Sequence, residues 1–132
     1  MRFLVIFLSL SFSLTTNSKE VRCGWLVNPT PSKIWLIDRD GLWSIFAQGG
    51  YTHLEDTSSD DKSLGFAYDA IADETQFVRT NGGYGFSCAC MTVDVNNEES
   101  AITLIYNSTQ QPLKQCLEDT DIINYIPLNI EK

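Results

Sequence analysis

Cys88 and Cys90 stand one residue apart within a long run of strand-forming residues, while the two other cysteines, Cys23 and Cys116, lie toward the ends of the chain. Residues two apart on a strand point to the same face, so this pair lies side by side. Their Cα atoms would be about 6.5–7 Å apart, at the limit of disulfide geometry, so each should bond a distant cysteine. Two pairings satisfy this condition, and both fasten the outer segments of the chain to one central strand.

The amino terminus indicates an oxidising compartment, where such disulfides form. Arg2 precedes an apolar stretch over residues 3–14, broken only by serines, and small polar residues follow up to Ser18. This is the layout of a secretory signal peptide, and at about 1.5 Å per residue the stretch reaches about 18 Å, short of the about 30 Å of a bilayer core. We therefore expect residues 1–18 to be cleaved and residues 19–132 to form a single domain. That domain would be periplasmic or secreted and would keep no stable membrane anchor.

The composition is acidic, with 17 Asp and Glu against 9 Lys and Arg and a formal net charge of −8. Loss of residues 1–18 removes one positive charge, Arg2, and leaves −9. A surface of this sign repels nucleic acid and anionic lipid, so neither is an expected partner. It suits a basic protein instead, such as a cationic envelope protein or a toxin domain.

The apolar pattern predicts an all-β or β-rich α+β domain, as a small antiparallel sheet or a partly closed barrel stapled by two disulfides. A hairpin is expected over residues 34–48. Its turn at Arg39-Asp40-Gly41 would set Ile37 opposite Trp43 and make one face of the ribbon wholly apolar.

Further along, residues 52–61 should form a polar surface loop, and residues 64–74 either a short strand or one to two helical turns. Apolar side chains on both faces of the strand predicted over residues 84–95 mark it as central. The remaining expected elements are strands over 76–80 and 101–106, a turn at Asn81-Gly82-Gly83 and a helical turn over 112–119.

No motif in the chain identifies a reaction. His53 is the only histidine, and it stands in a polar segment without a nucleophile-elbow sequence. Asp38 and Asp40 flank an expected hairpin turn, where aspartate is common for backbone reasons. An enzyme is therefore not favoured, and no catalytic residue is predicted. A cell-wall hydrolase that uses His53 or paired carboxylates remains an alternative.

A thiolate metal site is the second alternative. Cys88, Cys90, Cys116 and His53 provide three thiolates and an imidazole, a ligand set that suits zinc. The spacing is not a recognised zinc pattern, and exported thiols tend to oxidise. We therefore expect neither a metal nor another cofactor.

The function that remains is a protein-binding module of the inhibitor or immunity type. Small size, export, two disulfides, acidity and the lack of a catalytic set all favour it. Aromatic and polar residues near the turns offer a candidate binding surface. Its members are Trp25, Tyr51, Arg79, Asn81 and Tyr84.

Five short motifs occur together in the chain: Arg22-Cys23-Gly24-Trp25, Asn28-Pro29-Thr30-Pro31, Asp38-Arg39-Asp40-Gly41, Gln48-Gly49-Gly50-Tyr51 and the run over residues 79–90. Their combination resembles an uncharacterised family of small exported bacterial proteins, domain of unknown function 4087. The resemblance extends from Cys23 to about Cys116. The segment over residues 52–74 is longer in this chain than is expected for the family. It implies a bacterial envelope protein and brings no activity with it.

Overall fold

The structure is a computed structural model that describes residues 19–31, 33–47, 51–52 and 57–125 of the 132-residue chain. The predicted signal peptide and His53 lie outside the described residues. Within the described ranges, no helix has the length and apolar character needed to cross a membrane.

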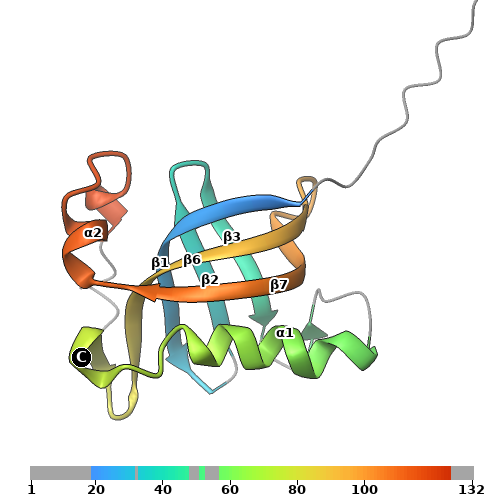
Figure 1. The fold of residues 1–132 in the computed structure, drawn as a ribbon, viewed down its shortest axis with the longest axis horizontal. Helices are drawn as coiled ribbons and strands as arrows, with labels where there is room; N and C mark the ends of the chain where they lie inside the picture. Colours follow the sequence, from blue (N-terminus) through green and yellow to red (C-terminus); the bar gives the residue numbers. More distant parts are fainter. Residues whose placement is uncertain (1–18, 32, 48–50, 53–56, 126–132) are drawn as a thin grey trace, which may run out of the picture.

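Strands make up most of the described chain, which confirms the predicted fold class (Figure 1). The helices are α1 (Thr57–Asp69) and α2 (Leu113–Leu117), with short 3-10 helices η1 (Glu74–Gln76) and η2 (Ile123–Tyr125). The strands are β1 (Glu20–Thr30), β2 (Lys33–Asp38), β3 (Gly41–Ala47), β4 (Tyr51–Thr52), β5 (Phe77–Asn81), β6 (Tyr84–Asn96) and β7 (Ala101–Gln111).

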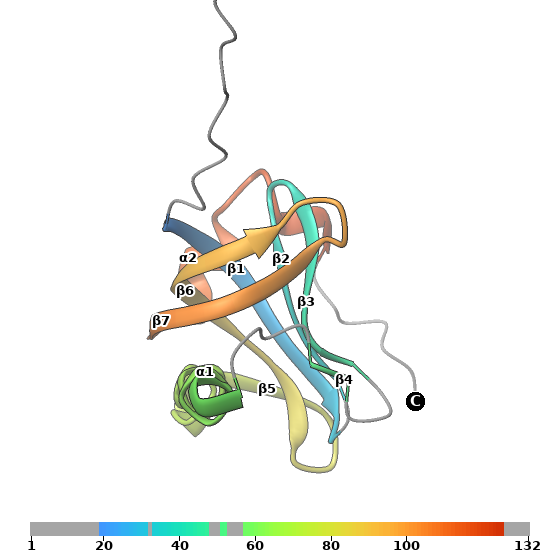
Figure 2. The same ribbon diagram turned by 90° about the vertical axis from the view of Figure 1, so that its right-hand side faces the viewer.

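The sheet closes on itself through β1, which pairs antiparallel with β2 on one side and with β6 on the other. Five strands thereby form a ring in the order β1-β2-β3-β7-β6, visible as a curved wall in Figure 2. β3 and β7 run parallel and meet at Ser44 and Ala101. This order, with a helix between the third and fourth strands of the ring, is that of the OB fold, a five-stranded and partly open Greek-key barrel. The predicted partly closed barrel is confirmed.

Gly24 permits the close contact between β1 and β2. A Cβ atom at this position would overlap the carbonyl oxygen of Ile37. β1 follows two partners at once here, because Gly24 pairs with Ala89 of β6 while the next residue, Trp25, pairs with Ile37 of β2. Glycine is needed where two backbones approach this closely.

The predicted register of the β2–β3 hairpin is wrong by one residue. The loop contains two residues, Arg39-Asp40, and Trp43 pairs with Leu36, not with Ile37. Because side chains alternate between the two faces of a strand, Trp43 points into the barrel while Ile37 points outward. The ribbon therefore buries apolar side chains on both faces instead of gathering them on one.

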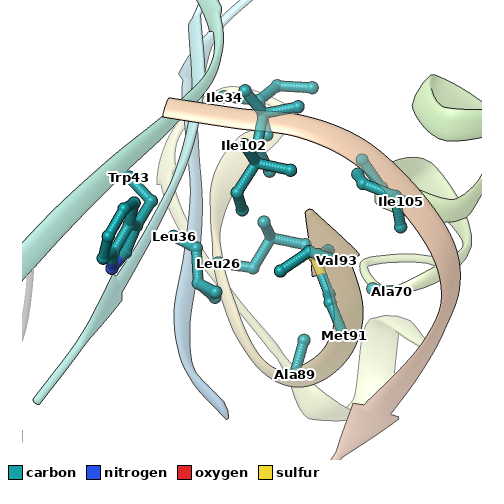
Figure 3. Packing of buried hydrophobic residues seen from close by; sticks show 12 residues of the cluster. Leu26, Ile34, Leu36, Trp43, Ala70, Ala89, Met91, Val93, Ile102 and Ile105 are labelled. Carbon is teal, nitrogen blue, oxygen red and sulfur yellow. The ribbon is translucent and has the colours of Figure 1, made fainter. Parts of the chain in front are cut away.

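Two apolar clusters explain this two-sided burial. The first fills the barrel and receives side chains from the five ring strands and from α1 (Figure 3). The second lies on the outer face of β1, β2 and β6, beneath the segment that contains α2. The first comprises Leu26, Ile34, Leu36, Trp43, Ile45, Ala67, Ala70, Ala89, Met91, Val93, Ile102 and Ile105. The second comprises Trp25, Val27, Phe86, Cys88, Cys116 and Ile122, with Trp35 and Ile37 packed against it.

α1 replaces part of the surface loop that was predicted over residues 52–61, because the helix already begins at Thr57. Of the two alternatives for the next segment, the helical one is correct. The buried hydroxyl of Ser63 accepts a hydrogen bond from the backbone N–H of Ile105 at 3.1 Å, which fastens α1 to β7. β7 extends to Gln111, beyond the predicted strand over residues 101–106. The predicted strand at β6, the turn that precedes it and the helical turn at α2 are confirmed.

Candidate functional site

All four cysteines form disulfides, and the structure decides between the two pairings left open by the sequence. Cys23 bonds Cys90, which lies directly opposite it in the β1–β6 ladder. Cys116 of α2 bonds Cys88. Because β6 pairs with β1, β5 and β7, the prediction that both outer segments are fastened to one central strand is confirmed. The bonded sulfurs leave no thiolate for the zinc site considered above.

Cys23 lines a groove with a volume of about 460 Å³. The groove lies between the first residues of β1, the β2–β3 hairpin and the segment after α2. The hairpin and the segment after α2 lie at the same end of the barrel in both ribbon views (Figures 1 and 2). Its wall carries five carboxylates and two guanidinium groups, so its net charge is negative. The lining residues are Glu20, Val21, Arg22, Cys23, Asp38, Arg39, Asp40, Asp119 and Asp121.

Arg22 is the centre of a charged network in the groove. Its Nη1 donates to Asp38 Oδ2 at 2.7 Å and to Asp40 Oδ2 at 3.0 Å, and its Nη2 donates to Glu20 Oε2 at 3.2 Å. The Asp38 side chain is only 4 % exposed. Its second oxygen, Oδ1, accepts the indole N–H of Trp43 at 3.0 Å and the backbone N–H of Asp40 at 2.9 Å. Every oxygen of this buried carboxylate is therefore hydrogen-bonded.

Both guanidinium groups of the groove already have partners. Burial by itself would lower the pKa of Arg22, but hydrogen bonds to Asp38 and Asp40 outweigh that effect and the pKa is raised. The pKa of Arg39 is also raised, chiefly by its hydrogen bond to Asp121. Both arginines remain positively charged. Because the groove is lined by five carboxylates and two guanidinium groups, it keeps an excess of negative charge.

The segment after α2 forms one wall of the groove and is held in three ways. The disulfide at Cys116 fixes its start, and Ile122, which is 1 % exposed, anchors it in the second apolar cluster. On the outside, Arg39 Nη2 donates to Asp121 Oδ2 at 3.1 Å between two exposed side chains. Asp119 Oδ1 accepts the backbone N–H of Asp121 at 2.9 Å and shapes the turn.

The structure separates the residues of the predicted binding surface. Trp25 is fully buried, because the segment that contains α2 covers the face of β1 that carries this side chain. Trp25 therefore belongs to the core. Arg79, Asn81 and Tyr84 do lie together on the β5–β6 hairpin, at the end of β1 opposite the groove (Figure 1). Arg79 pairs there with exposed Glu74 at 3.2 Å. The side chain of Tyr51 lies outside the described residues.

Sequence reasoning missed the groove. Its walls come from residues 20–23, 38–40 and 119–121, which are far apart along the chain. The available signals were the two acidic clusters that flank the hairpin turn and follow Cys116. Only the closure of the barrel and the second disulfide bring these clusters together.

The fold and the groove define a small, disulfide-bonded barrel of OB topology with an acidic groove on its surface. The chain matches the family model described as protein of unknown function DUF4087 over residues 17–123, and it belongs to that family. The resemblance inferred from its motifs is thereby confirmed. Searches of the curated proteins and of the solved structures found no match.

Proposed function

We propose that this protein is an exported binding module that holds a basic segment of a partner protein in its acidic groove. The carrying observation is the excess of carboxylates in the groove over the two guanidinium groups, each of which already has an intramolecular partner. A lysine or arginine of the partner would meet unbalanced negative charge there. Complementary charge of this kind speeds association and selects among partners.

The surroundings of the groove also suit a protein partner. Val21, in the groove wall, is 68 % exposed, and Leu42, just after the hairpin turn, is 48 % exposed. Apolar contacts next to charged ones are the usual composition of a protein interface. The β1 wall and the wall after α2 are each held by a disulfide, so little ordering entropy would be lost there when a partner binds.

The other ligands common to OB-type barrels fit this chain less well. Such barrels bind oligonucleotides and oligosaccharides on the face of their second and third strands. Here the outward side chains of β2, Trp35 and Ile37, are partly buried against the second apolar cluster, which includes Cys116 and Ile122. The net charge of −8 also repels nucleic acid. The fold alone therefore gives no reason to prefer these ligands.

The proposed location is the periplasm or the exterior of the cell. Two disulfides suggest a non-reducing, extracellular-type environment. The predicted signal peptide over residues 1–18 supports the same location. The hydrolase alternative requires His53 or paired carboxylates. His53 lies outside the described residues, and Asp38 and Asp40 both accept hydrogen bonds from Arg22. This alternative stays a prediction.

The test is a titration of the oxidised protein with two basic probes, a cationic muramidase and a lysine-rich peptide. The groove variant combines Asp40→Asn and Asp119→Asn. The control combines Asp69→Asn and Glu98→Gln, exposed positions outside the groove that change the net charge by the same amount. We expect the groove variant to weaken binding by about fivefold to tenfold, the control to have little effect, and added salt to weaken binding by the unaltered protein.

Equal losses in the two variants would show that the probes respond to net charge and not to the groove. Failure of both probes to bind at low salt would remove the proposal that the groove holds a basic segment.

A further inference from the structure

We propose that the Cys23–Cys90 disulfide is a thiol-exchange site that small external thiols attack while the Cys88–Cys116 disulfide stays closed to them. Cys23 is exposed and lines the groove, and Cys90 is half-buried. By contrast, Cys88 and Cys116 are each 2 % exposed and belong to the second apolar cluster. Thiol–disulfide exchange requires access to a sulfur, so the two bonds differ in reactivity. This inference does not depend on whether a basic protein occupies the groove.

The exchange has two steps. An external thiolate attacks Sγ of Cys23, forms a mixed disulfide with it, and releases Cys90 as a thiolate that takes a proton from water. A second external thiolate then attacks the external sulfur of the mixed disulfide and releases the Cys23 thiolate, which is protonated in turn. Two external thiols are oxidised to one disulfide, and one protein disulfide is reduced to two thiols.

Reduction at this site leaves the barrel closed. The β1–β6 ladder continues on both sides of the bond, from Glu20 opposite Val93 to Asn28 opposite Gly85. Backbone pairing therefore keeps the two reduced cysteines opposite each other, ready to be oxidised again. Transfer of the break to the second disulfide is hindered, because a freed thiolate would have to reach the sulfur of Cys88 or Cys116, and both residues are 2 % exposed within the second apolar cluster.

The charge of the groove selects among thiols. The attacking group is a thiolate, and it approaches Cys23 past carboxylates such as Glu20, Asp40 and Asp119. An aminothiol compensates its thiolate with an ammonium group, whereas an acidic thiol adds a second negative charge. We expect the rate to fall by about tenfold for each added negative charge at low ionic strength. The preferred reactant is therefore a cationic thiol.

The experiment treats the oxidised protein with cysteamine, 2-mercaptoethanol or 2-mercaptoethanesulfonate at equal thiolate concentration. Their thiolate forms carry no net charge, one negative charge and two. Alkylation followed by mass mapping gives the rate at which each cysteine becomes free. Because the three thiols differ in intrinsic nucleophilicity, their relative rates are compared between low salt and about 1 M salt, where charge effects are screened.

Two results are expected. Cys23 and Cys90 become labelled about tenfold or more faster than Cys88 and Cys116 with every thiol. The rate of reduction by cysteamine relative to the other two thiols is high at low salt and falls at high salt. This relative rate also falls in the Asp40→Asn, Asp119→Asn protein but not in the Asp69→Asn, Glu98→Gln control.

Release of all four cysteines together, release of Cys88 and Cys116 first, or no reduction of the folded protein would each overturn the assignment of the site. Relative rates that do not change with salt or with the groove variant would overturn the preference for cationic thiols. The measurement contains no protein partner, so its failure and the failure of the proposed binding function are distinguishable.

Discussion

Arg22 lies over the indole ring of Trp43, with its guanidinium carbon 3.9 Å from the ring centroid. The same guanidinium binds Asp38, and Asp38 accepts the indole N–H of Trp43, so the three side chains form a closed triangle. Trp43 belongs to the interior cluster, as Figure 3 shows, whereas Arg22 lines the groove. The triangle therefore joins the core of the barrel directly to the candidate binding site.

Replacement of Arg22 by methionine should destabilise the protein by about 3 kcal/mol, because it leaves the buried carboxylate of Asp38 without its charged partner. The Arg22 side chain is 10 % exposed and that of Asp38 is 4 % exposed, so water compensates little. Urea unfolding of the oxidised protein measures the change. The matched control is Arg79→Met, which breaks the exposed ion pair with Glu74 and should have little effect. Equal losses for the two variants would contradict a structural role for the triangle.

Gly24→Ala should be among the most damaging single-methyl additions in the chain. The new Cβ would overlap the Ile37 carbonyl oxygen, and the backbone there cannot move without loss of the β1–β2 pairing. We expect a loss of about 3 kcal/mol or more, the upper part of the range for overpacking.

The control for this prediction is Gly83→Ala. An added Cβ at Gly83 meets no atom within 4 Å, so the change should alter stability by less than about 0.5 kcal/mol. Thermal or urea unfolding of both variants decides the matter. A mild effect at Gly24 would mean that β1 and β2 can separate at little cost.

The sequence predicted the features that depend on local pattern or on elimination. β6 is identifiable as central because its first half is apolar on both faces, and the Cys-x-Cys spacing requires that both outer segments reach it. The β5–β6 turn follows from Asn81-Gly82-Gly83, where Gly82 indeed adopts a positive φ of 58°. Each of these features involves residues close in sequence or a bond with few alternatives.

The features that were missed depend on contacts between distant segments. A two-residue and a three-residue hairpin loop both suit Arg39-Asp40-Gly41, and the hydrogen bond of Trp43 to Asp38 and the outer cluster favour the shorter loop. The fully buried apolar residues of α1 and the residue after it, Ala67 and Ala70, are small, so the apolar stripe of the helix is weak in the sequence. The groove exists only once the barrel has closed and the C-terminal segment has docked.

The two disulfides should contribute differently to the structure. Loss of Cys88–Cys116 through paired alanine substitutions should cost about 3.5 kcal/mol by chain entropy for its separation of 28 residues. It should also release the segment over residues 112–125, because that bond and Ile122 provide its main attachments to the outer face. Hydrogen exchange should then accelerate in this segment.

Loss of Cys23–Cys90 should release no such local segment, because this bond joins two strands that are already paired. Its separation of 67 residues predicts a cost of about 4.5 kcal/mol, with protection of the C-terminal segment unchanged. Each double alanine variant is therefore the control for the other. Unchanged exchange over residues 112–125 after removal of Cys88 and Cys116 would show that apolar contacts alone hold the segment in place.

Tyr106 should make the stability of the protein fall at alkaline pH. Its hydroxyl donates to Asp94 Oδ2 at 2.6 Å, and this hydrogen bond is the main reason that the pKa of Tyr106 is raised above its ordinary value of 10.0. The folded state therefore keeps its proton at a pH where the unfolded chain has lost it. The stabilisation is complete below the ordinary pKa and disappears as the pH rises through the raised one.

Asp94→Ala removes both the acceptor and its charge, so the pKa of Tyr106 should return toward 10.0. Ultraviolet absorbance follows the ionisation of tyrosine, and Tyr106→Phe identifies the contribution of this ring. The difference in unfolding free energy between the unaltered protein and Asp94→Ala should be constant at neutral pH and should narrow once the pH exceeds the ordinary tyrosine pKa. A difference that stayed constant throughout the alkaline range would mean that the hydrogen bond does not hold the proton on Tyr106.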